Sequence, residues 1–111
     1  MVKWHPIEDI LFSASYDNTI KVWKHESTQD DWICLKTITE HTDTVWCIDF
    51  NEGGTLLISS GDDLKIILWT VKIDQNKIDI VKVAEIDNVH ERSIFSCAFS
   101  NTKLNLFASV I

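Results

Sequence analysis

The stretch SASYDNTIKVW, residues 13–23, decides the fold, because residues 59–69 repeat its arrangement as SSGDDLKIILW. In each copy an Asp follows a short apolar run, and a Trp lies six residues after that Asp. The two tryptophans, Trp23 and Trp69, are 46 residues apart. A period of about 20 to 50 residues is typical of proteins built from stacked repeats, so the repeat is the first feature to interpret.

Each copy has the pattern of a β-hairpin. Two short runs rich in β-branched and aromatic residues flank a polar turn, and Asp and Asn in that turn tolerate positive φ angles and bond the local backbone. The strand-turn-strand sets are 10–15, Tyr16-Asp17-Asn18 and 19–24, then 55–60, Gly61-Asp62-Asp63 and 65–71.

Further strand-like runs complete a regular series, whereas no stretch sustains an apolar stripe of helical period. These runs are 2–6, 31–38, 44–50, 77–86, 93–99 and 104–111. Four-stranded units with a period of about 40 to 50 residues are typical of β-propeller blades. We therefore predict an all-β propeller fragment with two complete four-stranded antiparallel blades and half of a third. The predicted boundaries are about 1–38, 44–86 and 93–111.

The bulk composition excludes several classes of partner. The chain has 111 residues and a net charge of −7, which argues against a nucleic-acid partner, since such modules carry a basic stripe. No apolar run approaches the roughly 20 residues of a membrane helix, and the N-terminus lacks the apolar core of a signal peptide. We expect a cytoplasmic protein without a membrane partner, with the nucleus as a second compartment.

At these residues the chain resembles the WD40 repeat family. The resemblance implies that His41, Ser59, Asp63 and Trp69 form the buried hydrogen-bonded tetrad of that family in the second unit. The dipeptides Glu40-His41 and Trp69-Thr70 depart from the Gly-His and Trp-Asp of the family pattern. The corresponding residues of the other units are Ser13, Asp17 and Trp23 in the first, whose histidine would precede Met1, and His90 in the third.

A narrower resemblance is to WD40 proteins of the cytosolic iron–sulfur protein assembly machinery. It rests on VKWHP, SYDNTIKVWK, DDWICL, HTDTVWCIDF and NVHERSIFSCAF. It implies a non-catalytic adaptor without a cofactor, whose partners are subunits of the targeting complex or client apoproteins. The alternatives are substrate recruitment to a ubiquitin ligase, recognition of chromatin peptides, or a truncated chain without function.

The chain is expected to be a fragment, because the Asp of the third unit would fall near position 112. Two and a half blades do not close a ring, so the blade edges would be open. Open strand edges invite pairing with other chains, and we expect the isolated chain to self-associate through them.

Other chemistry is disfavoured. Ser59, His41 and Asp63 could be read as a hydrolytic triad, but the strained GxSxG elbow is absent. The histidines share no metal-ligand spacing. The three cysteines lack the clustering that iron–sulfur ligation requires, and we predict that they are buried small apolar residues; they are Cys34, Cys47 and Cys97.

The candidate partner-binding residues lie on one expected rim. Trp46 and Phe95 hold equivalent places at the start of an inner strand, where they serve either as aromatic anchors for a partner or as core packing. Turns on the same rim carry Tyr16, Asp43 and Arg92. Arg92 is either an interface residue or part of an ordinary surface ion pair.

Overall fold

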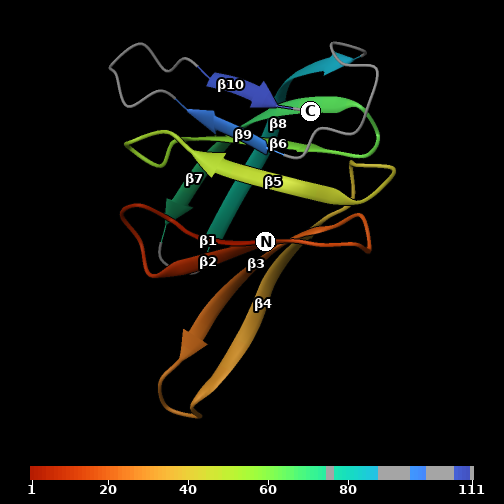
Figure 1. The fold of residues 1–111 in the computed structure, drawn as a ribbon. Helices are drawn as coiled ribbons and strands as arrows, with labels where there is room; N and C mark the ends of the chain where they lie inside the picture. The colour runs from red at the N-terminus through yellow and green to blue at the C-terminus, as the bar shows by residue number, and fades with distance from the viewer. Residues whose placement is uncertain (75–76, 88–95, 100–106, 111) are drawn as a thin grey trace.

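The computed structural model describes residues 1–74, 77–87, 96–99 and 107–110, and in these ranges every regular element is a strand. Figure 1 shows three successive antiparallel units. The strands are β1 (Val2–Trp4), β2 (Ile10–Ala14), β3 (Ile20–Glu26), β4 (Asp31–Ile38), β5 (Val45–Phe50), β6 (Leu56–Gly61), β7 (Lys65–Asp74), β8 (Lys77–Asp87), β9 (Ser96–Phe99) and β10 (Phe107–Val110).

The strands pair strictly with their neighbours in sequence. Strands β1 to β4 form the first sheet, β5 to β8 form the second sheet, and β9 and β10 form a third strand pair. All the pairs are antiparallel. The prediction of an all-β fold with two four-stranded blades and two strands of a third unit is confirmed.

The first two sheets also repeat in register. Trp4 lies opposite Leu11 in the first sheet, and Phe50 lies opposite Leu57 in the second. Each of these pairs is displaced by the same 46 residues that separate the two tryptophans of the hairpins. The repeat seen in the sequence is therefore a repeat of strand pairing as well.

The two hairpin turns use a left-handed residue at the same place. Asn18 has φ 72° in the turn between β2 and β3, and Leu64 has φ 62° in the turn between β6 and β7. The predicted second turn began at Gly61, but Gly61 belongs to β6. A Cβ at Gly61 would collide with the backbone oxygen of Thr44, so a glycine lets β5 and β6 approach closely at this end.

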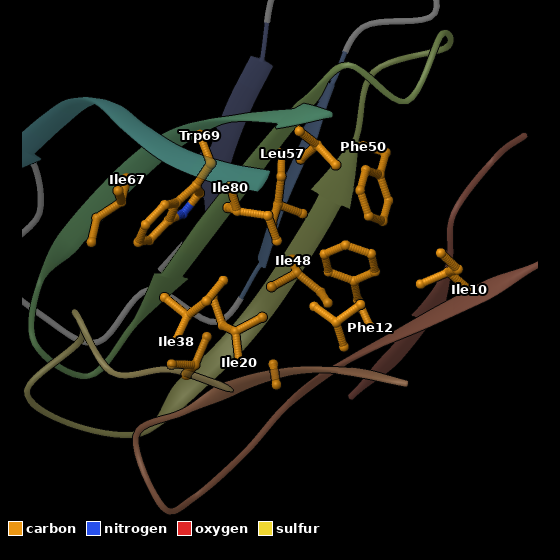
Figure 2. Packing of buried hydrophobic residues seen from close by; sticks show 14 residues of the cluster. Ile10, Phe12, Ile20, Ile38, Ile48, Phe50, Leu57, Ile67, Trp69 and Ile80 are labelled. Carbon is orange, nitrogen blue, oxygen red and sulfur yellow. The ribbon is translucent and has the colours of Figure 1, made fainter. Parts of the chain in front are cut away.

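The main core lies between the first and second sheets, as Figure 2 shows. Alternate residues of β2 and β3 enter it from one side, and Ile48, Phe50 and Leu57 enter it from the other. Phe12 and Phe50 meet edge to face at 4.8 Å between ring centroids. Because neither sheet buries this surface alone, the contact between the sheets supplies the hydrophobic stabilisation.

A second, smaller hydrophobic cluster lies between the second sheet and the third strand pair. It contains Cys47, Ile58, Ile66 and Cys97. Along β6, Leu57 faces the main core and Ile58 faces this second cluster, as expected for side chains that alternate across a strand. The second sheet is therefore apolar on both faces, which explains its continuous apolar runs.

Polar contacts also join the first two sheets. His5 is 8 % exposed, and its Nε2–H donates to the backbone oxygen of Gly54 at 2.8 Å. Its Nδ1 accepts from the backbone N–H groups of Ile7 and Glu8. Lys3 on β1 pairs with Asp49 on β5 at 2.9 Å. His5 is thus a buried link between the first two sheets.

The described part of the chain holds no helix that is long and apolar enough to cross a membrane.

Candidate functional site

The predicted tetrad of the second sheet lies in one buried network. His41 Nδ1 is 2.7 Å from the Asp63 carboxylate, and His41 Nε2 is 2.7 Å from the Ser59 hydroxyl. Trp69 Nε1–H donates to that hydroxyl at 2.9 Å. One proton arrangement satisfies every atom: Trp69 donates to Ser59, Ser59 donates to His41 Nε2, and His41 Nδ1–H donates to Asp63.

Asp63 connects this network to two backbone segments. Its carboxylate accepts the N–H of Thr42 at 3.1 Å, in the segment before β5, and the N–H of Lys65 at 3.2 Å, at the start of β7. The side chains of His41 and Asp63 are almost fully shielded from solvent, with exposures of 1 % and 2 %. Charge-assisted bonds in such a setting hold the turn and the incoming chain in one geometry.

Ser59 is inaccessible as well as bonded. Its relative exposure is 0 %, and its oxygen both accepts from Trp69 and lies against His41. A nucleophile must reach a substrate atom, and in this arrangement the surrounding core covers the oxygen. The geometry of Ser59 is that of a buried residue that bonds its neighbours within the core.

The first sheet contains a smaller version of the network. Trp23 Nε1–H donates to the Ser13 hydroxyl at 3.0 Å. Asp17 lies apart from these two residues, in the exposed turn, where it accepts the backbone N–H and the hydroxyl of Thr19. The hydroxyl bond from Thr19 is the main cause that holds the pKa of Asp17 below its ordinary value. The third-unit residue His90 lies outside the described residues.

A second cluster, which we call the aromatic rim, consists of Tyr16, Trp46 and Asp62. Trp46 is the extra residue of a β-bulge, since Val45 pairs with Gly61 and Cys47 pairs with Ser60. The bulge shifts the alternation along β5, so that Val45 enters the main core in place of Trp46. The indole of Trp46 therefore lies at the end of the sheet and outside the main core.

The ring of Trp46 is fixed from two sides. Its Nε1–H donates to the Asp62 carboxylate at 2.6 Å, and Tyr16 of the first sheet meets it edge to face at 5.2 Å. Tyr16 is 75 % exposed. A hollow of about 150 Å³ lies beside the two rings, where the N–H of Val45 donates to the oxygen of Ser15 across the sheets.

Of the three other rim candidates, the structure describes one. Asp43 is exposed and accepts the N–H of Thr44, which lines the hollow. Arg92 and Phe95 lie outside the described residues. The structure therefore brings Tyr16 and Trp46 together and places Asp43 beside them.

Comparison with known proteins identifies the repeat. The family model of the WD domain, G-beta repeat, matches residues 1–24 and 32–70, which is more than half of the chain. The chain belongs to the WD40 repeat family.

Relatives of this WD40 chain come from several animals and fungi. The probable cytosolic iron-sulfur protein assembly protein CIAO1 homolog of Ixodes scapularis is 35 % identical over 103 residues, which cover 92 % of this chain and 31 % of that protein. The corresponding homolog of Schistosoma japonicum is 40 % identical over 51 % of this chain and 16 % of its own length. Transducin beta-like protein 3 of Mus musculus is 38 % identical over 65 % of this chain and 9 % of its own length. The WD40 chain thus spans about a third of the first relative.

Sequence reasoning missed two residues of this WD40 site. Asp62 was expected only as a turn residue, yet it accepts the Trp46 indole. Asn18 donates from its side chain to the oxygen of Thr42 at 3.4 Å, joining the two sheets at the same end. The signal available was Gly61, because a glycine inside a strand often marks a bulge and a re-aimed side chain.

The cysteine prediction is partly wrong. Cys47 and Cys97 are buried as expected, but Cys34 is exposed on β4, the outermost strand of the first sheet. Solvent covers that side of an edge strand, so an apolar sequence context does not bury the thiol. Within the described ranges no group of three or more His, Cys, Asp or Glu side chains is arranged to hold a metal ion.

Proposed function

We propose that this WD40 chain belongs to a non-catalytic scaffold that binds other proteins, and that its role lies in cytosolic iron–sulfur protein assembly. The names of the relatives from Ixodes scapularis and Schistosoma japonicum support the pathway. In this proposal the partners are subunits of a targeting complex or client apoproteins. In this proposal the protein acts in the cytoplasm and also in the nucleus.

The aromatic rim is the observation that carries the binding role. An exposed Tyr beside a Trp held by Asp62 offers a large contact surface whose side chains are already ordered. Tyr and Trp are enriched among the residues that dominate binding energy at protein interfaces. Because Trp46 is fixed before a partner arrives, binding loses less side-chain entropy.

The buried network supports the non-catalytic part of the proposal. Ser59 and His41, the two residues that could form a nucleophile and base, are engaged with Trp69 and Asp63 inside the core. In this interpretation the network stiffens the turn between β6 and β7, which also carries Asp62. The packing network thereby supports the binding rim.

The proposal is tested by capture and by affinity. A tagged chain is expressed in cells, the retained proteins are identified, and the dissociation constant of a purified partner is measured by titration calorimetry. We expect iron–sulfur assembly proteins to be retained. We also expect Tyr16→Ala combined with Trp46→Ala to weaken binding at least tenfold, as for a pair of interface hot spots.

The matched control is Trp32→Ala, which removes another exposed indole from β4, away from the rim. If the rim variant and the control bind the partner with equal dissociation constants, the aromatic rim is not the binding surface. Retention of ubiquitin-ligase or chromatin proteins in place of assembly proteins would contradict the pathway and favour another WD40 adaptor role.

A further inference from the structure

Two of the three cysteines are in contact although they are 50 residues apart in sequence. The Sγ atoms of Cys47, on β5, and Cys97, on β9, lie 2.9 Å from one another. Both side chains are buried, with exposures of 3 % and 5 %. They belong to the second cluster, between the second sheet and the third strand pair, and take no part in the tetrad or the aromatic rim.

The hydrogen bonds at this pair are directed mainly at one sulfur. Cys47 Sγ accepts the thiol proton of Cys97 and, at 3.0 Å, the backbone N–H of Cys97. In its thiol form Cys47 donates to the Cys97 oxygen at 3.2 Å and to the oxygen of Ile48 at 3.8 Å. Two donors converge on Cys47, so its thiolate is the better stabilised of the two.

This asymmetry separates the acidities of the two thiols. The hydrogen bond from the Cys97 thiol, with that from the Cys97 N–H, lowers the pKa of Cys47 to about 7 against the effect of burial. The same thiol contact and burial raise the pKa of Cys97. Since the thiolate is the reactive form of cysteine, Cys47 is the nucleophile and Cys97 retains its proton.

A buried hydroxyl lies next to the pair. Ser60 lies opposite Cys47 in the register of β5 and β6, and its side chain is fully buried. Its hydroxyl interacts with the Cys97 thiol, and this contact opposes, without cancelling, the rise in the pKa of Cys97.

We propose that Cys47 and Cys97 are a redox-active thiol pair, which a hydroperoxide oxidises to a disulfide that links β5 to β9. The Cys47 thiolate attacks the terminal oxygen of the hydroperoxide, and the O–O bond breaks. Cys47 becomes a sulfenic acid, and the departing alkoxide or hydroxide takes a proton from water. The Cys97 sulfur then attacks the Cys47 sulfur, and the sulfenic oxygen leaves as water with the Cys97 proton.

The balance is complete without a further reactant. Two thiols and one hydroperoxide give one disulfide, one water and one alcohol, or a second water when the oxidant is hydrogen peroxide. Hydrogen peroxide is only slightly larger than water, which suits a thiol pair buried in the protein. A dithiol reductant reverses the change by thiol–disulfide exchange. The disulfide would close a loop of about 50 residues and so stabilise the contact between the second sheet and β9.

The experiment treats the full 111-residue chain with increasing hydrogen peroxide, blocks the remaining thiols, and maps the peptides by mass spectrometry. We expect a linked Cys47–Cys97 peptide pair with a mass two hydrogens lower, reversed by dithiothreitol. We also expect the thermal midpoint of the oxidised chain to rise by about 5 °C or more. Links through Cys34, or a Cys47 and Cys97 that stay reduced while Cys34 is oxidised, would overturn the proposal.

Single substitutions assign the two roles. Cys97→Ser should leave a sulfenic acid on Cys47, which dimedone traps when the oxidised chain is unfolded in its presence, whereas Cys47→Ser should remove both dimedone trapping and the linked peptide. Cys34→Ser is the matched control and should leave the Cys47–Cys97 link unchanged. Trapping on Cys97 in the Cys47→Ser chain would overturn the assignment of the nucleophile. If either core variant fails to fold, the peptide map of the unsubstituted chain still decides whether the disulfide forms.

Discussion

At the scale of single residues, Ser59 is a hydrogen-bond partner shared by two buried side chains of the network. Its hydroxyl serves Trp69 as an acceptor and lies in hydrogen-bond contact with His41, and both partners are buried. The bonds themselves contribute modestly, but a buried donor left without a partner costs the full desolvation of that group. Ser13 holds the same place in the first sheet with one partner, the partly buried Trp23.

We predict that Ser59→Ala lowers the free energy of unfolding by about 2–4 kcal/mol, since it leaves two buried groups unsatisfied. The matched substitution Ser13→Ala should cost about 1 kcal/mol or less, because Trp23 can reach water. Urea unfolding followed by tryptophan fluorescence measures both values. Equal losses in the two variants would contradict the view that burial of the network sets its contribution.

At the scale of elements, the two hairpin turns both require a residue with a positive φ, and they use different residues for it. The turn between β2 and β3 places Asn18 in the left-handed region, where Asn is well tolerated. The turn between β6 and β7 places Leu64 there, and a Leu side chain is strained at such a φ. The second hairpin therefore contains backbone strain at Leu64, and the packing of its sheet more than offsets the free energy of that strain.

We predict that Leu64→Asn raises the free energy of unfolding by about 0.5–1 kcal/mol, because it relieves the left-handed strain. The reciprocal change Asn18→Leu should lower it by a similar amount. The urea midpoints of the two variants give the comparison. A loss of stability in Leu64→Asn would mean that the contacts of the half-buried Leu side chain outweigh the strain.

The first of these turns also contains a carboxyl group with a lowered pKa, that of Asp17. Hydrogen bonds from Thr19 and Ser15 and the charge of Lys21 hold the pKa of exposed Asp17 below its ordinary value of 3.8, with the Thr19 hydroxyl as the largest cause. A lowered pKa in the folded state means that the ionised Asp17 stabilises the fold. This contribution is present above the unfolded pKa and is lost as the pH falls through the folded one.

We predict that Asp17→Asn is less stable than the unsubstituted chain at neutral pH, and that the two converge as the pH falls below about 4. Urea midpoints of both chains between pH 7 and pH 2 provide the test. A difference that stays constant through this range would show that the amide disturbs the turn geometry without any electrostatic effect.

At the scale of the whole molecule, stability depends on the junction between the first two sheets. The main core lies in this junction, with Phe12 against Phe50, and His5 reaches across its end to Gly54. Gly54 has φ 69°, and a Cβ there would collide with the His5 ring. The outer face of the first sheet is open and exposes Val2, Trp4 and Trp32. Self-association through open surfaces of this kind stays a prediction.

We predict that Gly54→Ala lowers the free energy of unfolding by about 2–3 kcal/mol, through left-handed strain and displacement of His5. Gly53→Ala is the matched control, since a Cβ at Gly53 meets nothing within 4 Å, and it should change the stability by less than about 0.5 kcal/mol. In a His5→Ala background the cost of Gly54→Ala should shrink to the strain alone. An unchanged cost in that background would exclude the ring contact as its cause.

The sequence by itself determined the strands, the turns and the repeat, because short-range pairing depends on alternation and turn chemistry that each hairpin contains within itself. The four tetrad positions of the second sheet were expected from the resemblance of these residues to the WD40 family. Only the tertiary structure decided which faces meet. It brought Cys47 to Cys97, His5 to Gly54 and Tyr16 to Trp46, left Cys34 exposed, and used a bulge to release Trp46 from the core. These contacts join separate sheets, and their geometry depends on how whole sheets pack, which no local pattern of residues encodes.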